Sequence, residues 1–149
     1  MMPMHERQQR QFTVAEANAL LGDLSRQLER LRELKATAAR QYEEMRSIRE
    51  VGYRADGNLI MLTDYQNAKR EFDRVVGEAN RIVAEVHALG CRITDVEMGL
   101  VDFPATLGNQ PVHLCWKLGE PEVLYYHEPQ EGYRGRRPLP PAWRQPAED

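Results

Sequence analysis

The stretch from residue 113 to residue 128, HLCWKLGEPEVLYYHE, holds most of the side chains in this sequence that can carry out chemistry. Its thiol, imidazole and carboxylate groups are the ligand types that zinc and related divalent ions take in proteins. Acidic residues just outside the stretch are able to reach the same place from neighbouring segments. The resulting candidate metal ligands are Asp102, Cys115, His127 and Glu131.

The spacing of these residues does not by itself establish a metal site. The sequence has neither a Cys-x-x-Cys pair nor a His-x-x-x-His pair, which are usual signatures of zinc ligation. The simpler alternative is that Cys115 is a free thiol that packs as a small hydrophobic group, with a histidine hydrogen-bonded beside Trp116. Catalysis by a Cys115 nucleophile is not favoured, because no glycine-rich elbow or oxyanion-type turn follows it.

A β-hairpin is expected to carry these side chains. The runs VHLCWKL and EVLYYHE alternate in polarity and flank GEPE, a proline-containing turn. The pairs expected from that turn are Leu118 with Val123, Trp116 with Tyr125, and Leu114 with His127. This register places Cys115 and His127 on opposite faces, which argues against a single metal cluster, although a slip of one residue would exchange the faces.

The segment GYRGRRPL adds a candidate anion site. Arg134, Arg136 and Arg137 lie there on a glycine-rich backbone and are able to bind a phosphate or a carboxylate. The alternative is that Arg136 pairs with Asp102 or Glu131 and fixes the end of the chain to the sheet. A small pocket on the sheet, with His127 in its lining, is also expected. Its candidate ligand-binding residues are Trp116, Tyr125, Glu120 and Arg136.

Two long helices precede these strands and must position them. Thr13 and Glu16 form the signature of a capping box, and apolar residues spaced by three and four extend this first helix to about residue 50. A second start signal lies at Thr63 and Gln66, and Gly90 is placed to end that helix in the left-handed conformation. The pattern predicts an antiparallel coiled-coil hairpin.

Further apolar residues lie outside the seam between the two helices. They are Leu20, Leu34, Val76 and Val83. A two-helix seam does not use these positions, so they need another packing layer. That layer is either the β part of this chain or a second chain, and the second alternative predicts a homodimer or a protein partner bound through the helical hairpin.

The composition limits the functions available to the chain. It has 149 residues, of which 42% are apolar and 29% charged, and its net charge of −3 provides no basic field for nucleic acid. No run approaches the roughly 20 apolar residues that a membrane helix needs, and the polar start has no secretory signal. We therefore expect a cytoplasmic protein with reduced thiols that binds neither membranes nor nucleic acid.

The motifs FTVAEANALL, ALGC, GLVDFPA, LCWKLGEPEVLYYHE and GYRGRRPL resemble the bacterial family catalogued as domain of unknown function 2203. The resemblance covers residues 11–139 and implies a small bacterial cytosolic protein, but it brings no activity, substrate or cofactor with it. The family's pattern falls on Asp102, Cys115, Trp116, Gly119, Glu120, His127, Gly135 and Arg136. Tyr126 stands where the family usually has a tryptophan, so an aromatic residue is kept.

These patterns predict an α+β protein in which a long antiparallel coiled-coil helical hairpin is followed by a small antiparallel β-sheet. The predicted parts are an N-terminal tail over residues 1–11, the hairpin over 12–90, a β module over 91–139 and a proline-rich tail over 140–149. The expected function is a non-enzymatic interaction or ligand-binding module that self-associates through its hairpin. The alternatives are a metal-binding or metal-dependent module, with zinc or another divalent ion as cofactor, and an anion or nucleotide binder through Arg134–Arg137.

Overall fold

A computed structural model describes residues 10–144 of the chain. The chain divides into two compact units, one made of the residues up to Leu28 together with those from Ala84 onward, and one made of Glu29–Val83. The predicted boundary after residue 90 was placed where the apolar spacing changes from helical to strand-like. The division into compact units instead falls within the two long helices. Most of the predicted N-terminal tail, and residues 145–149 of the predicted C-terminal tail, lie outside the described residues. The helices are α2 (Val14–Ala19), α3 (Leu21–Val51) and α4 (Leu62–Ala88).

The start of the first helix confirms the predicted capping box. The Thr13 hydroxyl accepts the Glu16 backbone N–H at 3.0 Å, and the Glu16 carboxylate accepts the Thr13 backbone N–H at 2.9 Å. The prediction of one uninterrupted helix is wrong, because the chain breaks at Leu20 between α2 and α3. There the Leu20 N–H donates to the Ala17 carbonyl, three residues back, which tightens the turn beyond α-helical geometry.

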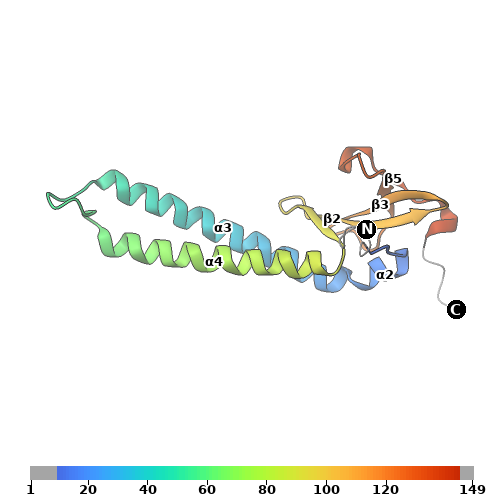
Figure 1. Ribbon diagram of the computed structural model, residues 1–149, viewed down its shortest axis with the longest axis horizontal. Coiled ribbons are helices and arrows are strands. Elements are labelled where there is room, and N and C mark those ends of the chain that lie inside the picture. The colour runs from blue at the N-terminus through green and yellow to red at the C-terminus, as the bar shows by residue number, and fades with distance from the viewer. Residues whose placement is uncertain (1–9, 145–149) are drawn as a thin grey trace, which may run out of the picture. The chain divides into compact units, whose positions relative to one another are not determined.

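Within the unit of residues 29–83, α3 and α4 run antiparallel beside each other (Figure 1). In the contacts between the two helices, later residues of α3 meet earlier residues of α4, as expected for antiparallel helices. Arg30 pairs with Glu78, the Tyr42 and Phe72 rings lie 6.4 Å apart, and Arg49 donates to the Tyr65 hydroxyl. Helix α4 begins at Leu62, one residue before the predicted cap, and Gly90 follows its end with the predicted positive φ of 105°. No helix in the described part of the chain has both the length and the apolar character needed to cross a membrane.

The other unit contains an antiparallel sheet with the strand order β1-β2-β3-β4-β5, so each strand pairs with its neighbour in the sequence. The strands are β1 (Arg92–Asp95), β2 (Leu100–Leu107), β3 (Gln110–Lys117), β4 (Tyr125–His127) and β5 (Arg137–Pro138). Two short 3-10 turns, η1 (Tyr133–Gly135) and η2 (Pro141–Trp143), lie near the end of the chain. Together with the helices, this sheet confirms the predicted α+β class.

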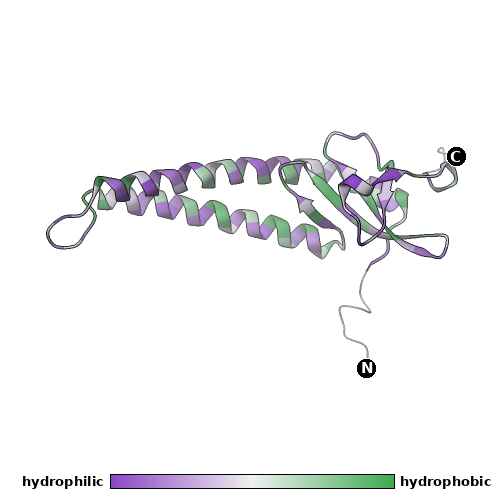
Figure 2. Ribbon diagram, turned by 90° about the horizontal axis from the view of Figure 1, so that it is seen from above, coloured by the Kyte–Doolittle hydropathy of each residue, from purple (hydrophilic) through white to green (hydrophobic). Residues whose placement is uncertain are grey.

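The two faces of the sheet have different roles. Side chains alternate along a strand, and one face of β2 and β3 carries a buried apolar set: Val101, Phe103, Ala105, Val112, Leu114 and Trp116. Figure 2 shows these strands as mostly apolar, whereas apolar and polar residues alternate along the long helices. The Phe12 ring meets the Phe103 ring edge-on at 5.2 Å, so the N-terminal segment covers this face. The opposite face is therefore the one that can carry a site.

The predicted register of the β3–β4 pair is wrong by one residue. The observed pairs are His113 with His127, Leu114 with Tyr126, and Cys115 with Tyr125. The predicted tight turn does not form, because β3 ends at Lys117 and residues 118–124 make a longer connection. In that connection the Glu120 side chain accepts the Lys117 N–H, and the Asn18 side chain of α2 accepts the Val123 N–H at 2.7 Å. The slip moves His127 to the same face as Cys115.

Candidate metal centre

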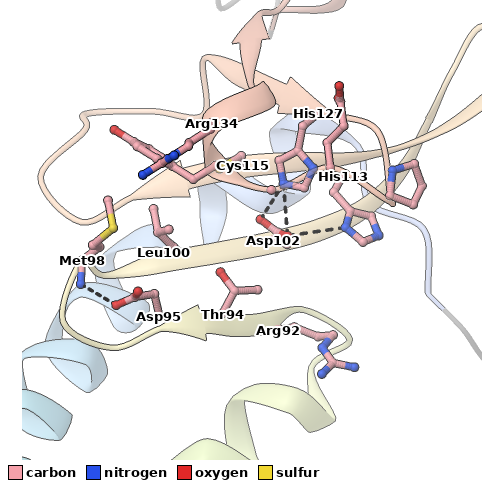
Figure 3. Close-up of a pocket in the computed structure, with 14 residues that line it drawn as sticks. Arg92, Thr94, Asp95, Met98, Leu100, Asp102, His113, Cys115, His127 and Arg134 are labelled. Atoms are coloured by element: carbon pink, nitrogen blue, oxygen red, sulfur yellow. Dashed lines mark hydrogen bonds and ion pairs between the residues drawn. The ribbon is translucent and has the colours of Figure 1, made fainter.

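Three of the four predicted metal ligands meet on the face of the sheet opposite the buried apolar set. Asp102, Cys115 and His127 come from the adjacent strands β2, β3 and β4, and their ligand atoms all lie within 4.8 Å of one another. All three residues are buried, and Asp102 and His127 are the buried polar residues of the described chain. Figure 3 shows dashed lines between His127 and Asp102, with Cys115 labelled beside them.

The hydrogen bonds of His127 determine what its second ring nitrogen can do. Its Nδ1 lies 2.8 Å from the carbonyl oxygen of Glu128, and because a carbonyl only accepts, Nδ1 carries the hydrogen. In the neutral ring, Nε2 then bears a lone pair, and it faces both carboxylate oxygens of Asp102 at 3.2 Å. Two acceptors in this position repel each other unless a proton or a cation lies between them.

The distances fit a shared divalent ion. Ligand atoms bound tetrahedrally to zinc at their usual bond lengths lie roughly 3.3–3.6 Å from one another. The separation of 3.2 Å between His127 Nε2 and the Asp102 oxygens is close to that range. The Cys115 thiol lies within 4.8 Å of both groups, so it needs to approach by at most about 1 Å. A small side-chain adjustment therefore completes a set of three ligands.

The environment of Cys115 keeps its thiol protonated in the absence of a metal. Burial, together with the nearby Asp102 carboxylate, raises the pKa of the Cys115 thiol to about 11. The Arg136 guanidinium, 4.0 Å from Sγ, acts in the opposite direction but does not outweigh burial. A buried thiol beside a carboxylate is a poor nucleophile, whereas a bound cation would remove its proton and use the thiolate as a ligand.

His113 and the fourth predicted ligand, Glu131, lie around the three central residues. His113 Nδ1 is 3.5 Å from Asp102 Oδ2, on the side away from Cys115 in Figure 3. Glu131 lines the same cavity, but its Oε1 accepts the Glu128 N–H at 3.0 Å and pairs with Arg137 at 2.7 Å. The Glu131 carboxylate is therefore already bound by Glu128 and Arg137, and the structure does not bring it into the cluster. The sequence already places His113 on the same strand face as Cys115, because the two residues are spaced by two along β3.

The four predicted ligand-binding residues contact one another instead of lining a pocket together. Glu120 and Arg136 make a two-point ion pair, and the Trp116 ring N–H donates to the Glu120 carbonyl oxygen at 2.9 Å. The Arg136 guanidinium lies over the Tyr125 ring at 4.0 Å and over the Tyr133 ring at 4.5 Å. None of the four predicted residues is among the described residues that line the cavity over the cluster. Arg136 therefore holds the chain end on the sheet, as one alternative expected, but its partner is Glu120.

A cavity of about 810 Å³ opens over the three central residues. This volume is in the range of small-molecule sites. Its lining comes from all of the first four strands and from the segment before β5, and it includes Thr94, Met98, Leu100, Pro129, Tyr133 and Arg134. Gly135 keeps the segment close, because a Cβ there would lie only 2.9 Å from the Glu131 carboxyl carbon. A metal held by the three ligands would thus face a space that a small molecule can enter.

Comparison with known proteins gives one match. Residues 10–139 match the model of the family described as uncharacterized conserved protein, domain of unknown function 2203. No curated protein and no solved structure matches the chain. Because the match covers both the helices and the whole sheet, the chain belongs to the family of domain of unknown function 2203.

Proposed function

We propose that this protein is a metal-binding module in which Asp102, Cys115 and His127 hold a divalent transition-metal ion. Zinc fits the mixed set of carboxylate, thiolate and imidazole ligands best. The observation that carries the proposal is the orientation of His127, whose Nε2 faces the Asp102 carboxylate at 3.2 Å beside the Cys115 thiol in a buried cluster. A cation between these acceptors turns their repulsion into two bonds.

The observed register supports the metal-binding module over the interaction module that the sequence favoured. The predicted register placed Cys115 and His127 on opposite faces, which argued against a metal site. The observed pairing of His113 with His127 removes that objection. Three protein ligands beside an open cavity resemble catalytic zinc sites more than closed structural ones, which use four. His113, 3.5 Å from Asp102, then acts as an outer partner that orients the carboxylate.

The two cysteines offer a matched test of this proposal. Both are free and buried, but only Cys115 belongs to the cluster. The full chain is purified without chelator, reconstituted with zinc, and its metal content is measured by elemental mass spectrometry. We expect about one zinc per chain in the wild type and in Cys91→Ser, and loss of zinc in Cys115→Ser and Asp102→Asn.

Circular dichroism of each variant tests whether the fold is retained. If the reconstituted wild type holds no stoichiometric metal, or if both cysteine variants lose it equally, the proposal is wrong. The Asp102–His127 pair would then be an ion pair with a protonated imidazole.

A second proposal concerns the helical unit, where we propose that the chain self-associates through its helical hairpin, including the connection between α3 and α4. Its support is the exposure of large apolar side chains in the unit of residues 29–83: Tyr42, Val51, Tyr53 and Ile60 are each more than half exposed. Leu34, one of the residues outside the predicted seam, is only 2% exposed in the single chain and is not available to a partner. Light scattering should give a dimer mass for the wild type and a monomer mass for the double variant Tyr53→Ser, Ile60→Ser. A monomeric wild type at high concentration would exclude this second proposal.

A further inference from the structure

Arg134 is the arginine of the GYRGRRPL segment that is still free to bind a ligand. Arg136 pairs with Glu120, and Arg137 pairs with Glu131. Among the described residues no carboxylate pairs with Arg134, which is exposed and lines the cavity over the metal cluster. The segment therefore presents one unpaired guanidinium to the cavity.

None of the acidic side chains that line the cavity in the described part of the chain forms an ion pair with this guanidinium. Glu131 is paired with Arg137, and Asp95 keeps its negative charge while its Oδ1 accepts the Met98 backbone N–H at 2.8 Å. A bound divalent ion would be balanced by the Asp102 carboxylate and the Cys115 thiolate, so it contributes an open coordination position but no net charge. Electrostatic attraction for an anion at this end of the cavity therefore depends on Arg134.

The position of Arg134 relative to the cluster defines the shape of the ligand. Figure 3 shows Arg134 on the side of Cys115, Met98 and Leu100, whereas Arg92 and His113 lie on the opposite side of Asp102. The Arg134 side of the cavity thus combines one guanidinium, the apolar side chains of Met98 and Leu100, and access to the metal position, with the Asp95 carboxylate beside Met98. Such a surface suits a small molecule with an oxyanion and a short apolar part.

We propose that the cavity binds a small oxyanion, a phosphate or a carboxylate group, which takes the open position of the metal and pairs with Arg134. This inference rests on the proposed metal site and names the class of its ligand. The guanidinium supplies two parallel N–H groups that match either anion. Loss of a charge-assisted contact of this kind weakens binding by about tenfold or more.

Substitution with Co²⁺ on the full-length chain reports both metal binding and anion binding, because Co²⁺ binds at zinc sites and absorbs visible light. Thiolate-to-cobalt absorption in the near ultraviolet shows that Cys115 binds the metal, and the visible bands respond to any further ligand. Inorganic phosphate and acetate are titrated separately, which distinguishes the two anions. Arg134→Gln is compared with Arg144→Gln, since Arg144 is also exposed but lies outside this cavity.

We expect saturable changes in the visible bands with at least one anion, an apparent Kd about tenfold higher in Arg134→Gln, and an unchanged Kd in Arg144→Gln. Normal cobalt bands that neither anion alters would overturn this inference while leaving the metal site intact. Equal anion affinities in the two arginine variants would overturn it as well. Absence of cobalt bands in the wild type would refute the metal site itself and, with it, the anion site.

Discussion

Burial determines how reactive the Cys115 thiol is, because burial raises its pKa. With a pKa of about 11, the thiol is ionised at pH 8 to roughly one part in a thousand, whereas an unperturbed thiol has a pKa near 8.5. In metal-free Cys91→Ser protein, we expect iodoacetamide to modify Cys115 about 100-fold more slowly than free glutathione at pH 8. Because the thiolate is the reactive form and the pKa is raised, the rate should rise about tenfold per pH unit up to pH 11.

Intact-mass spectrometry over time measures this rate, and Cys115→Ser serves as the control for modification at other sites. Reaction as fast as that of glutathione would mean that the thiol is activated. It would then favour a nucleophilic role for Cys115, which the raised pKa argues against.

At the scale of single strands, the sequence predicts which residues share a face but not which strands bring them together. Alternation along β3 places Leu114 and Trp116 on one face, and both side chains are buried. The register of β4 depends on contacts that no local pattern contains, such as the bond from the Val123 N–H to Asn18, 105 positions away in the sequence. A slip of one residue there decides whether Cys115 and His127 share a face, so the candidate site was not predictable from the strand pattern alone.

The Glu120–Arg136 pair stabilises this connection and offers a test of it. Both side chains are less than one fifth exposed, and Glu120 also accepts the Lys117 N–H. Replacing Glu120 with Gln leaves the Arg136 charge without its partner, and we expect a loss of about 1–3 kcal/mol in the free energy of unfolding by urea. Glu122→Gln, an exposed neighbour in the same connection, should change stability by less than about 0.5 kcal/mol. Equal effects of the two variants would contradict a structural role for the pair.

The antiparallel helices carry a pH-dependent contact. Glu78 accepts two hydrogen bonds from Arg30, and these lower the Glu78 pKa below the ordinary value of a glutamate. A carboxyl whose pKa is lowered in the folded state contributes stability above its unfolded pKa and loses it as the pH falls through the folded value. We expect Glu78→Gln to lower the thermal midpoint slightly at pH 7, and the difference from wild type to disappear below pH 4.5 as Glu78 is protonated.

Thermal unfolding followed by circular dichroism at several pH values measures this difference. Glu29→Gln, on an exposed position of α3 in the same unit, is the matched control and should differ little from the wild type at any pH. A Glu78→Gln deficit that persists at acid pH would show that packing, and not charge, is what the glutamate contributes.

At the scale of the whole molecule, the two compact units have separate proposed roles. Every residue of the metal cluster and of its cavity belongs to the unit that contains the sheet. The exposed apolar side chains proposed for self-association belong to the unit of residues 29–83. Ligand binding in one unit and association through the other are therefore separable by mutation, which a site shared between units would not allow.

Metal binding should accordingly stabilise one unit and not the other. A ligand present at 100 times its Kd stabilises the state that binds it by about 2.7 kcal/mol, which corresponds to about 100-fold slower hydrogen exchange for amides that exchange when the site opens. We expect zinc to slow exchange in β2, β3 and β4, where the three ligands lie, and to leave residues 29–83 unchanged. Mass spectrometry of peptides after exchange measures both regions at once, and Cys115→Ser should remove the effect of zinc. Equal protection of both regions would mean that the units open together, so that the division by compactness has no counterpart in stability.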